Sequence, residues 1–159
     1  AALKRSTGPS VIALSRQGLP PVRTNHRAEN LCEGGAYELS PAEGKATATL
    51  IATGSETAIA LDAQSSLQGD GIPTRVVSMP CQELFDARSQ TERDDILQPD
   101  TIRVAIEAAS TMGWHRYVGE KGSVIGMESF GASAPAKELF PYFGITAEAV
   151  VNAVKARLT

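Results

Sequence analysis

The chain has 159 residues, of which 42% are hydrophobic and 21% charged, a balance typical of a globular domain and unlike that of a disordered tail. Fifteen Lys and Arg face 18 Asp and Glu, and this formal charge of −3 argues against a strongly basic nucleic-acid surface. No apolar stretch approaches the roughly 18–20 residues of a membrane-spanning helix. Neither nucleic acid nor a membrane is therefore expected as a partner.

The first nine residues resemble the end of a helix. Lys4 and Arg5 would lie in its last turn, Gly8 suits a left-handed cap, and Pro9 prevents continuation. Because no helix precedes this turn, we expect the sequence to be cut from a longer polypeptide. The apolar run at residues 10–15 then predicts a short buried strand.

A polar stretch follows from residue 16 to about residue 37. It contains Pro20, Pro21, Gly34 and Gly35, and it would be unusually long for a structureless loop inside a compact domain. This stretch therefore indicates a linker between two domains.

Beyond the linker, apolar runs alternate with helical patterns. Strands are predicted at residues 47–53, 74–78, 103–108 and 123–127, with an edge strand at 37–39 that could run antiparallel. Helices are predicted from about 56 to 67, at 81–87, 91–97 (with Ser89 and Glu92 at capping-box spacing), 135–140 and 146–158. The alternation predicts an α/β fold: an open, mostly parallel sheet of about five strands with helices on both faces, a Rossmann-like three-layer arrangement.

Cysteine and histidine are too sparse to predict a zinc site, which needs about four close ligands. Cys32 and Cys81 lie far apart in the sequence, and the two histidines, His26 and His115, stand alone. The cysteines fit two free thiols in a reducing compartment, and a single disulfide remains an alternative. A cytoplasmic location is the corresponding expectation.

No known catalytic motif is present, so no catalytic residue is predicted. The turn at residues 53–57 could hold an anion at a helix N-terminus, or it could be a plain turn capped by Ser55, with Glu56 occupying the positive end of the helix. His115 fits a surface or interface side chain better than a base. Asp94 and Asp95 are consecutive, so they do not face each other and fit solvated charges. Residues 131–135 fit a loop and helix cap.

Arg16 is the one candidate ligand-binding residue. It directly follows the strand predicted at residues 10–15, at the end where ligands gather in open α/β sheets. A guanidinium there could clamp a phosphate or carboxylate through two parallel hydrogen bonds. A salt bridge across the linker is the structural alternative.

Five segments together resemble one known family. They are residues 14–17 (Leu-Ser-Arg-Gln), 52–56 (Ala-Thr-Gly-Ser-Glu), 75–80 (Arg-Val-Val-Ser-Met-Pro), 117–119 (Tyr-Val-Gly) and 130–136 (Phe-Gly-Ala-Ser-Ala-Pro-Ala). In this order and spacing they resemble the C-terminal part of transketolase, the thiamine-diphosphate enzyme of the pentose phosphate and Calvin pathways. The resemblance covers essentially the whole chain.

The resemblance implies a division of the chain and a role for Arg16. Residues 1–19 would be the terminal piece of the pyrimidine-binding domain, 20–39 an interdomain linker, and 40–159 the C-terminal domain. Arg16 would help to bind the phosphate group of a sugar phosphate. The segments that hold thiamine diphosphate and Mg²⁺ (or Ca²⁺) in the parent enzyme are absent from this sequence, so it is expected to bind no cofactor or metal.

The implied parent is a homodimer that transfers a two-carbon ketol unit between ketose and aldose phosphates. This chain would then be a structural and assembly module, inactive alone, whose partners are the rest of the transketolase chain and a second subunit. Two alternatives stay open. One is a free-standing regulatory or nucleotide- or anion-binding domain, and the other is the last domain of a related thiamine-diphosphate enzyme.

Overall fold

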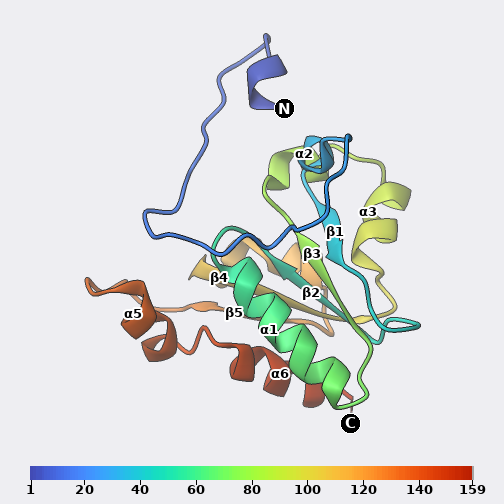
Figure 1. Cartoon of the computed structure of the whole chain (residues 1–159), viewed down its shortest axis with the longest axis vertical. Helices are drawn as coiled ribbons and strands as arrows, with labels where there is room; N and C mark the ends of the chain where they lie inside the picture. The colour runs from blue at the N-terminus through green and yellow to red at the C-terminus, as the bar shows by residue number, and fades with distance from the viewer. Residues whose placement is uncertain (159) are drawn as a thin grey trace.

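The computed structural model describes residues 1–158 and contains one five-stranded sheet in the order β1-β3-β2-β4-β5 (Figure 1). The strands are β1 (Tyr37–Ser40), β2 (Ala48–Ala52), β3 (Thr74–Ser78), β4 (Ile102–Ser110) and β5 (Ser123–Met127). The helices are α1 (Glu56–Gly69), α2 (Gln82–Asp86), α3 (Gln90–Leu97), α4 (His115–Val118), α5 (Ala136–Tyr142) and α6 (Ala147–Lys155). Three 3₁₀ turns complete the set: η1 (Ala2–Lys4), η2 (Leu31–Gly34) and η3 (Thr111–Gly113).

Four strands of the sheet are parallel, and the edge strand β1 is antiparallel to β3. In the centre of the sheet Leu50 of β2 lies between Val76 of β3 and Val104 of β4. All five residues of β2 and all five of β3 are buried, as expected for strands covered on both faces. The predicted mostly parallel sheet and its antiparallel edge strand are confirmed.

Helices cover both faces of the sheet, which gives three layers (Figure 1). Successive side chains of a strand point to opposite faces, so Leu50 and Ile51 of β2 belong to different cores. The core around Leu50 is completed by α1 and α6, and the core around Ile51 by α2, α3 and α4. The predicted α/β architecture with helices on both faces is therefore confirmed.

The capping box predicted for α3 is confirmed, whereas other helix starts differ from the prediction. Ser89 accepts a hydrogen bond from the Glu92 backbone, and Glu92 reaches back to Ser89, which makes the predicted capping box of α3. Thr146 caps α6 by accepting a hydrogen bond from Ala149 N–H through its hydroxyl. Pro135, predicted in the first turn of α5, occupies the N-cap position instead. The last helix ends at Lys155, earlier than predicted, and Leu158 is half exposed.

The N-terminal arm, residues 1–30, is where the sequence prediction fails. Only residues 2–4 form a turn, of the 3₁₀ type, and Gly8 is not among the glycines with positive φ. Residues 10–15 form no strand, and Val11 and Leu14 are 94% and 84% exposed. A strand exists only when its backbone pairs with another strand, and no strand of the described chain lies beside this run. Both local predictions here are therefore wrong for this structure.

Packing begins abruptly after the arm. No residue between 1 and 34 is buried, and Gly35 is the first buried residue of the chain. The arm leaves the sheet as an extended loop (Figure 1). The proposed domain boundaries at residues 19/20 and 39/40 stay a prediction, although β1 already pairs within the sheet from Tyr37.

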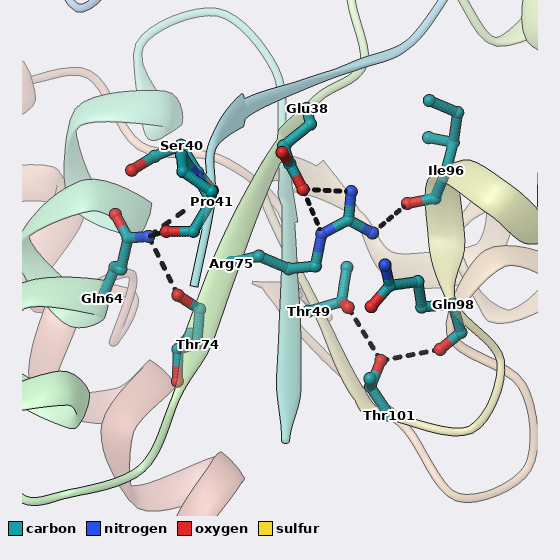
Figure 2. Close-up of polar contacts among 10 residues, drawn as sticks. All are labelled: Glu38, Ser40, Pro41, Thr49, Gln64, Thr74, Arg75, Ile96, Gln98 and Thr101. Atoms are coloured by element: carbon teal, nitrogen blue, oxygen red, sulfur yellow. Dashed lines mark hydrogen bonds and ion pairs between the residues drawn. The ribbon is translucent and has the colours of Figure 1, made fainter. Parts of the chain in front are cut away.

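Buried polar groups hold β1 to the rest of the sheet (Figure 2). The side chain of Arg75 is 4% exposed, and its Nε donates to Glu38 Oε2 at 2.7 Å. Arg75 Nη1 donates to the carbonyl of Ile96, at the end of α3, at 2.6 Å. Gln64 Nε2 donates to the carbonyls of Pro41 and Thr74 at 3.0 and 2.9 Å. These contacts satisfy backbone groups that burial would otherwise leave unpaired.

Candidate functional site

The carboxyl edge of the sheet, where ligands bind in open α/β folds, is the first place to look for a site. The chain leaves β2 for α1 on one face, and it leaves β4 for α4 on the other face. These two strands are neighbours; Ala52, the last residue of β2, pairs with Ile106 of β4, and β4 continues to Ser110. Loops that diverge in this way create a crevice at the topological switch point.

Glu56 occupies this edge from the start of α1. Glu56 is 4% exposed, and Ser55 Oγ donates a hydrogen bond to its Oε1 at 3.1 Å. Burial raises the pKa of Glu56, while hydrogen bonds from its own backbone, from Ser55 and from the Ala108 backbone act in the opposite direction. The positive end of α1 therefore already holds a carboxyl group, and an anion-binding turn at residues 53–57 does not fit. Ser55 makes no side-chain cap, so that detail of the prediction is wrong.

Glu107 brings a second carboxyl group to the same edge, near the end of β4. Its burial, together with the charge of Glu56, raises the pKa of Glu107 to about 7. Neither residue has a local sequence signal for this role, because Glu56 and Glu107 lie far apart in the sequence and meet only through the pairing of β2 with β4. The edge therefore presents two carboxyl groups to any ligand that binds there.

The raised pKa of Glu107 predicts a specific pH dependence of stability. The folded chain holds this proton more tightly than the unfolded chain, so folding stability falls as pH rises from about 4.5 to about 7. We expect Glu107→Gln to raise the free energy of unfolding by about 1–2 kcal/mol at pH 8, allowing for solvent screening, and to change it little at pH 4. Urea unfolding of both proteins across this range measures the difference.

A matched control is Glu120→Gln, which removes an exposed carboxylate from the turn before β5. This variant should follow the wild-type stability within about 0.5 kcal/mol at every pH. An equal gain at pH 4 and pH 8 for Glu107→Gln would contradict the assignment, because it would show a packing effect independent of ionisation.

A crevice of about 690 Å³ lies beside these carboxyl groups. It is lined by the ends of β4 and β5 and by the loops that follow them, residues 108–111 and 127–130. Phe130 at its rim is 98% exposed, and nearby Met112 is 83% exposed. Glu128 is the only charged residue of the lining, so the crevice offers no cation for a phosphate group.

Arg16, the predicted phosphate ligand, lies in the arm and is not among the residues that line the crevice. Its residue is exposed, and its guanidinium has no hydrogen-bond or ion-pair partner within residues 1–158. The predicted strand before it does not form, so its placement at a strand end is not seen in this structure. The salt bridge across the linker, the structural alternative, is absent from the described chain. Its role in binding phosphate stays a prediction.

The other singled-out residues have structural positions. His115 is exposed at the start of α4 beside the buried Trp114, as expected for a surface side chain. Asp94 accepts a hydrogen bond from Gln90 at 2.7 Å, and it makes no pair with Asp95. Residues 131–135 form an exposed loop that ends at the N-cap of α5.

Residues 1–158 contain neither a metal-binding cluster nor a membrane-spanning helix. No group of three or more His, Cys, Asp or Glu side chains in this part of the chain could hold a metal ion. None of its helices is both long enough and apolar enough to cross a bilayer.

Sequence reasoning also missed the ion pair between Arg75 and Glu38, because it joins residues on different strands and leaves no local pattern.

Comparison with known proteins gives consistent matches. The model of the transketolase-like C-terminal domain matches residues 35–146. Transketolase of Rhodobacter capsulatus is 52% identical over 163 residues, which cover 99% of this chain and 24% of the relative. The chain thus spans about a quarter of the length of the curated relatives that it matches.

Two solved structures show the same fold. Transketolase of Pichia stipitis in complex with xylulose 5-phosphate superposes with a TM-score of 0.79 and 34% identity, over 90% of this chain and 20% of that one. The inactive β4 tetramer of a split-gene transketolase superposes with a TM-score of 0.70 and 27% identity, over 90% of this chain and 48% of that one.

Proposed function

This chain belongs to the transketolase family and corresponds to its C-terminal domain, and on that basis we propose that it serves a parent enzyme that transfers a two-carbon ketol unit between ketose and aldose phosphates. The observation that carries the proposal is the match to transketolases over 99% of the chain at 52% identity. The Pichia stipitis relative is a complex with a sugar phosphate, which supports phosphorylated sugars as substrates.

Within that parent we assign the chain a structural and assembly role. Its sheet is complete and covered on both faces, whereas its arm carries exposed apolar side chains that need a partner to be buried. We propose that residues 1–19 complete a neighbouring domain of the parent, and that the parent acts as a homodimer in the cytoplasm. In a split-gene relative, a chain that contains this domain forms an inactive tetramer, which fits a domain that does not catalyse alone.

The described residues offer little that suits thiamine diphosphate and its metal. No group of three or more His, Cys, Asp or Glu side chains in residues 1–158 could hold a metal ion, and the carboxyl edge of the sheet presents Glu56 and Glu107 where a diphosphate would need cations or N–H donors. We therefore place cofactor binding on other parts of the parent, and we propose that this chain alone neither binds the cofactor nor turns over sugars.

Arg16 is proposed to contact the phosphate group of the sugar substrate. Its guanidinium is exposed and has no partner in residues 1–158, so it can pair with an anion without breaking an existing contact. In the full-length enzyme, Arg16→Ala should raise the KM for a phosphorylated ketose by roughly ten- to a hundredfold, the effect of a lost charged contact. The KM for an unphosphorylated ketose donor should stay nearly unchanged.

Two further variants sharpen this steady-state experiment. Arg23→Ala removes another exposed arginine of the same arm and should leave both KM values unaltered. Arg16→Lys keeps the charge but loses the two parallel hydrogen bonds of a guanidinium. Its KM for the phosphorylated ketose should therefore lie between the values of the wild type and Arg16→Ala. Equal losses with both donors for Arg16→Ala would refute phosphate binding but would leave family membership intact.

A further inference from the structure

The two cysteines, 49 positions apart in the sequence, are both hydrogen-bonded through their backbones to the same residue, Gly35. The Gly35 N–H donates to the carbonyl of Cys32 at 3.1 Å, and the Cys81 N–H donates to the carbonyl of Gly35 at 3.1 Å. Cys32 belongs to η2, and Cys81 is the N-cap of α2. These two short elements pack against each other and lie side by side (Figure 1).

No side chain separates the two backbones at this point. Gly35 has φ +79°, and a Cβ built on it would lie 2.4 Å from the Cys81 carbonyl oxygen and 2.3 Å from the Phe85 nitrogen. The backbone around Gly35 is therefore in direct contact with the first turn of α2. Each cysteine is joined to Gly35 by one backbone hydrogen bond.

Both thiols are free and accessible to a small oxidant. Cys32 is exposed, and Cys81 is partly exposed. The Cys81 thiol donates to the Glu83 carboxylate at 3.4 Å, a weak contact at the surface. Neither thiol is held in the hydrophobic core, so neither has the inert setting of a structural cysteine.

We propose that Cys32 and Cys81 form a reversible disulfide, a redox modification site that fastens the base of the arm to α2. The oxidant is hydrogen peroxide. The exposed Cys32 thiolate attacks one peroxide oxygen, the O–O bond breaks, and Cys32 becomes a sulfenic acid as the first water forms. The Cys81 thiolate then attacks the Cys32 sulfur, the S–S bond forms, the S–O bond breaks, and a second water leaves.

The two thiols together lose two electrons and two protons, and the peroxide gains them as two molecules of water. A dithiol reverses the reaction by thiol–disulfide exchange and becomes oxidised itself.

The geometry of a disulfide requires the two Cα atoms to approach within about 7 Å. The segment that would have to adjust is η2, which buries no residue and follows an arm that buries none either. An adjustment there disrupts no core packing, whereas α2 is anchored by the fully buried Phe85. The expected movement is therefore a small shift of η2 toward α2.

The test is oxidation of the 159-residue chain by a small excess of hydrogen peroxide, followed by alkylation and non-reducing peptide mapping. We expect a peptide pair that joins Cys32 to Cys81 within one chain, lighter by two hydrogens, with both thiols blocked and both recovered after treatment with dithiothreitol. In concentrated urea the same linkage should form at least about tenfold more slowly, because the fold no longer holds the cysteines near each other.

Single variants identify the order of the two steps. Cys81→Ser should leave a sulfenic acid on Cys32 that dimedone traps, and Cys32→Ser should give less dimedone-trapped sulfenic acid on Cys81, because Cys32 is the residue that peroxide oxidises first. Circular dichroism checks that both variants keep the fold. Independent sulfinic acids on the two cysteines, links only between chains, or equal rates with and without urea would each overturn the proposal.

Discussion

Replacing Gly35 by alanine is expected to lower the free energy of unfolding by about 2–5 kcal/mol, the largest effect of any change considered. Two costs add together. The backbone of Gly35 has φ +79°, which side chains tolerate poorly, and the added methyl group would overlap backbone atoms of Cys81 and Phe85. Backbone atoms in a helix turn cannot rotate away as a flexible side chain can. Urea or thermal unfolding of the two proteins measures the loss.

Gly71→Ala is the matched control. Gly71 has φ +76°, almost the same as Gly35, but a Cβ there would have no neighbour within 4 Å. This variant therefore carries the backbone cost alone, about 1–2 kcal/mol. Similar losses for the two variants would show that the contact between Gly35 and α2 contributes nothing.

Arg75→Met is expected to lower the free energy of unfolding by about 2–4 kcal/mol. The substitution keeps much of the buried side-chain volume but removes the hydrogen bonds to Glu38 and to the Ile96 carbonyl. The antiparallel edge strand β1 and the end of α3 then lose their shared anchor. Amide hydrogen exchange should accelerate most in β1, while β2 and β4 stay protected.

A double-mutant cycle isolates the ion pair from the rest. The side chain of Glu38 on β1 is 40% exposed, whereas that of Arg75 is 4% exposed. Glu38→Ala therefore leaves a buried guanidinium without its carboxylate. Combining it with Arg75→Met should give a coupling energy of about 1.5–3 kcal/mol. A coupling below about 0.5 kcal/mol would show that the pair behaves like an exposed salt bridge.

The sheet could be predicted because its strands carry strong local signals. The runs at 74–78 and 123–127 match β3 and β5 residue for residue, and the capping box at Ser89 marks the start of α3. The run at residues 10–15 has an equally apolar pattern, yet it stays unpaired in this chain. Local pattern indicates that a segment can form a strand, but pairing depends on residues distant in sequence.

The site could be predicted far less well, for the same reason. Arg16 was singled out by its position after an apolar run and by a family motif, and it has no hydrogen-bond or ion-pair partner within residues 1–158. Glu56 and Glu107 share an edge only because β2 pairs with β4, and Arg75 meets Glu38 only because β1 pairs with β3. Sequence spacing carries no trace of either meeting.

The arm also determines which part of the chain a denaturation experiment reports on. Because nothing before Gly35 is buried, those residues meet nearly the same solvent in the native and denatured states. The denaturant m-value and the heat-capacity increment both scale with newly hydrated surface, so they derive almost wholly from residues 35–158. Dividing either quantity by the full chain length would therefore understate its value per folded residue by roughly a fifth.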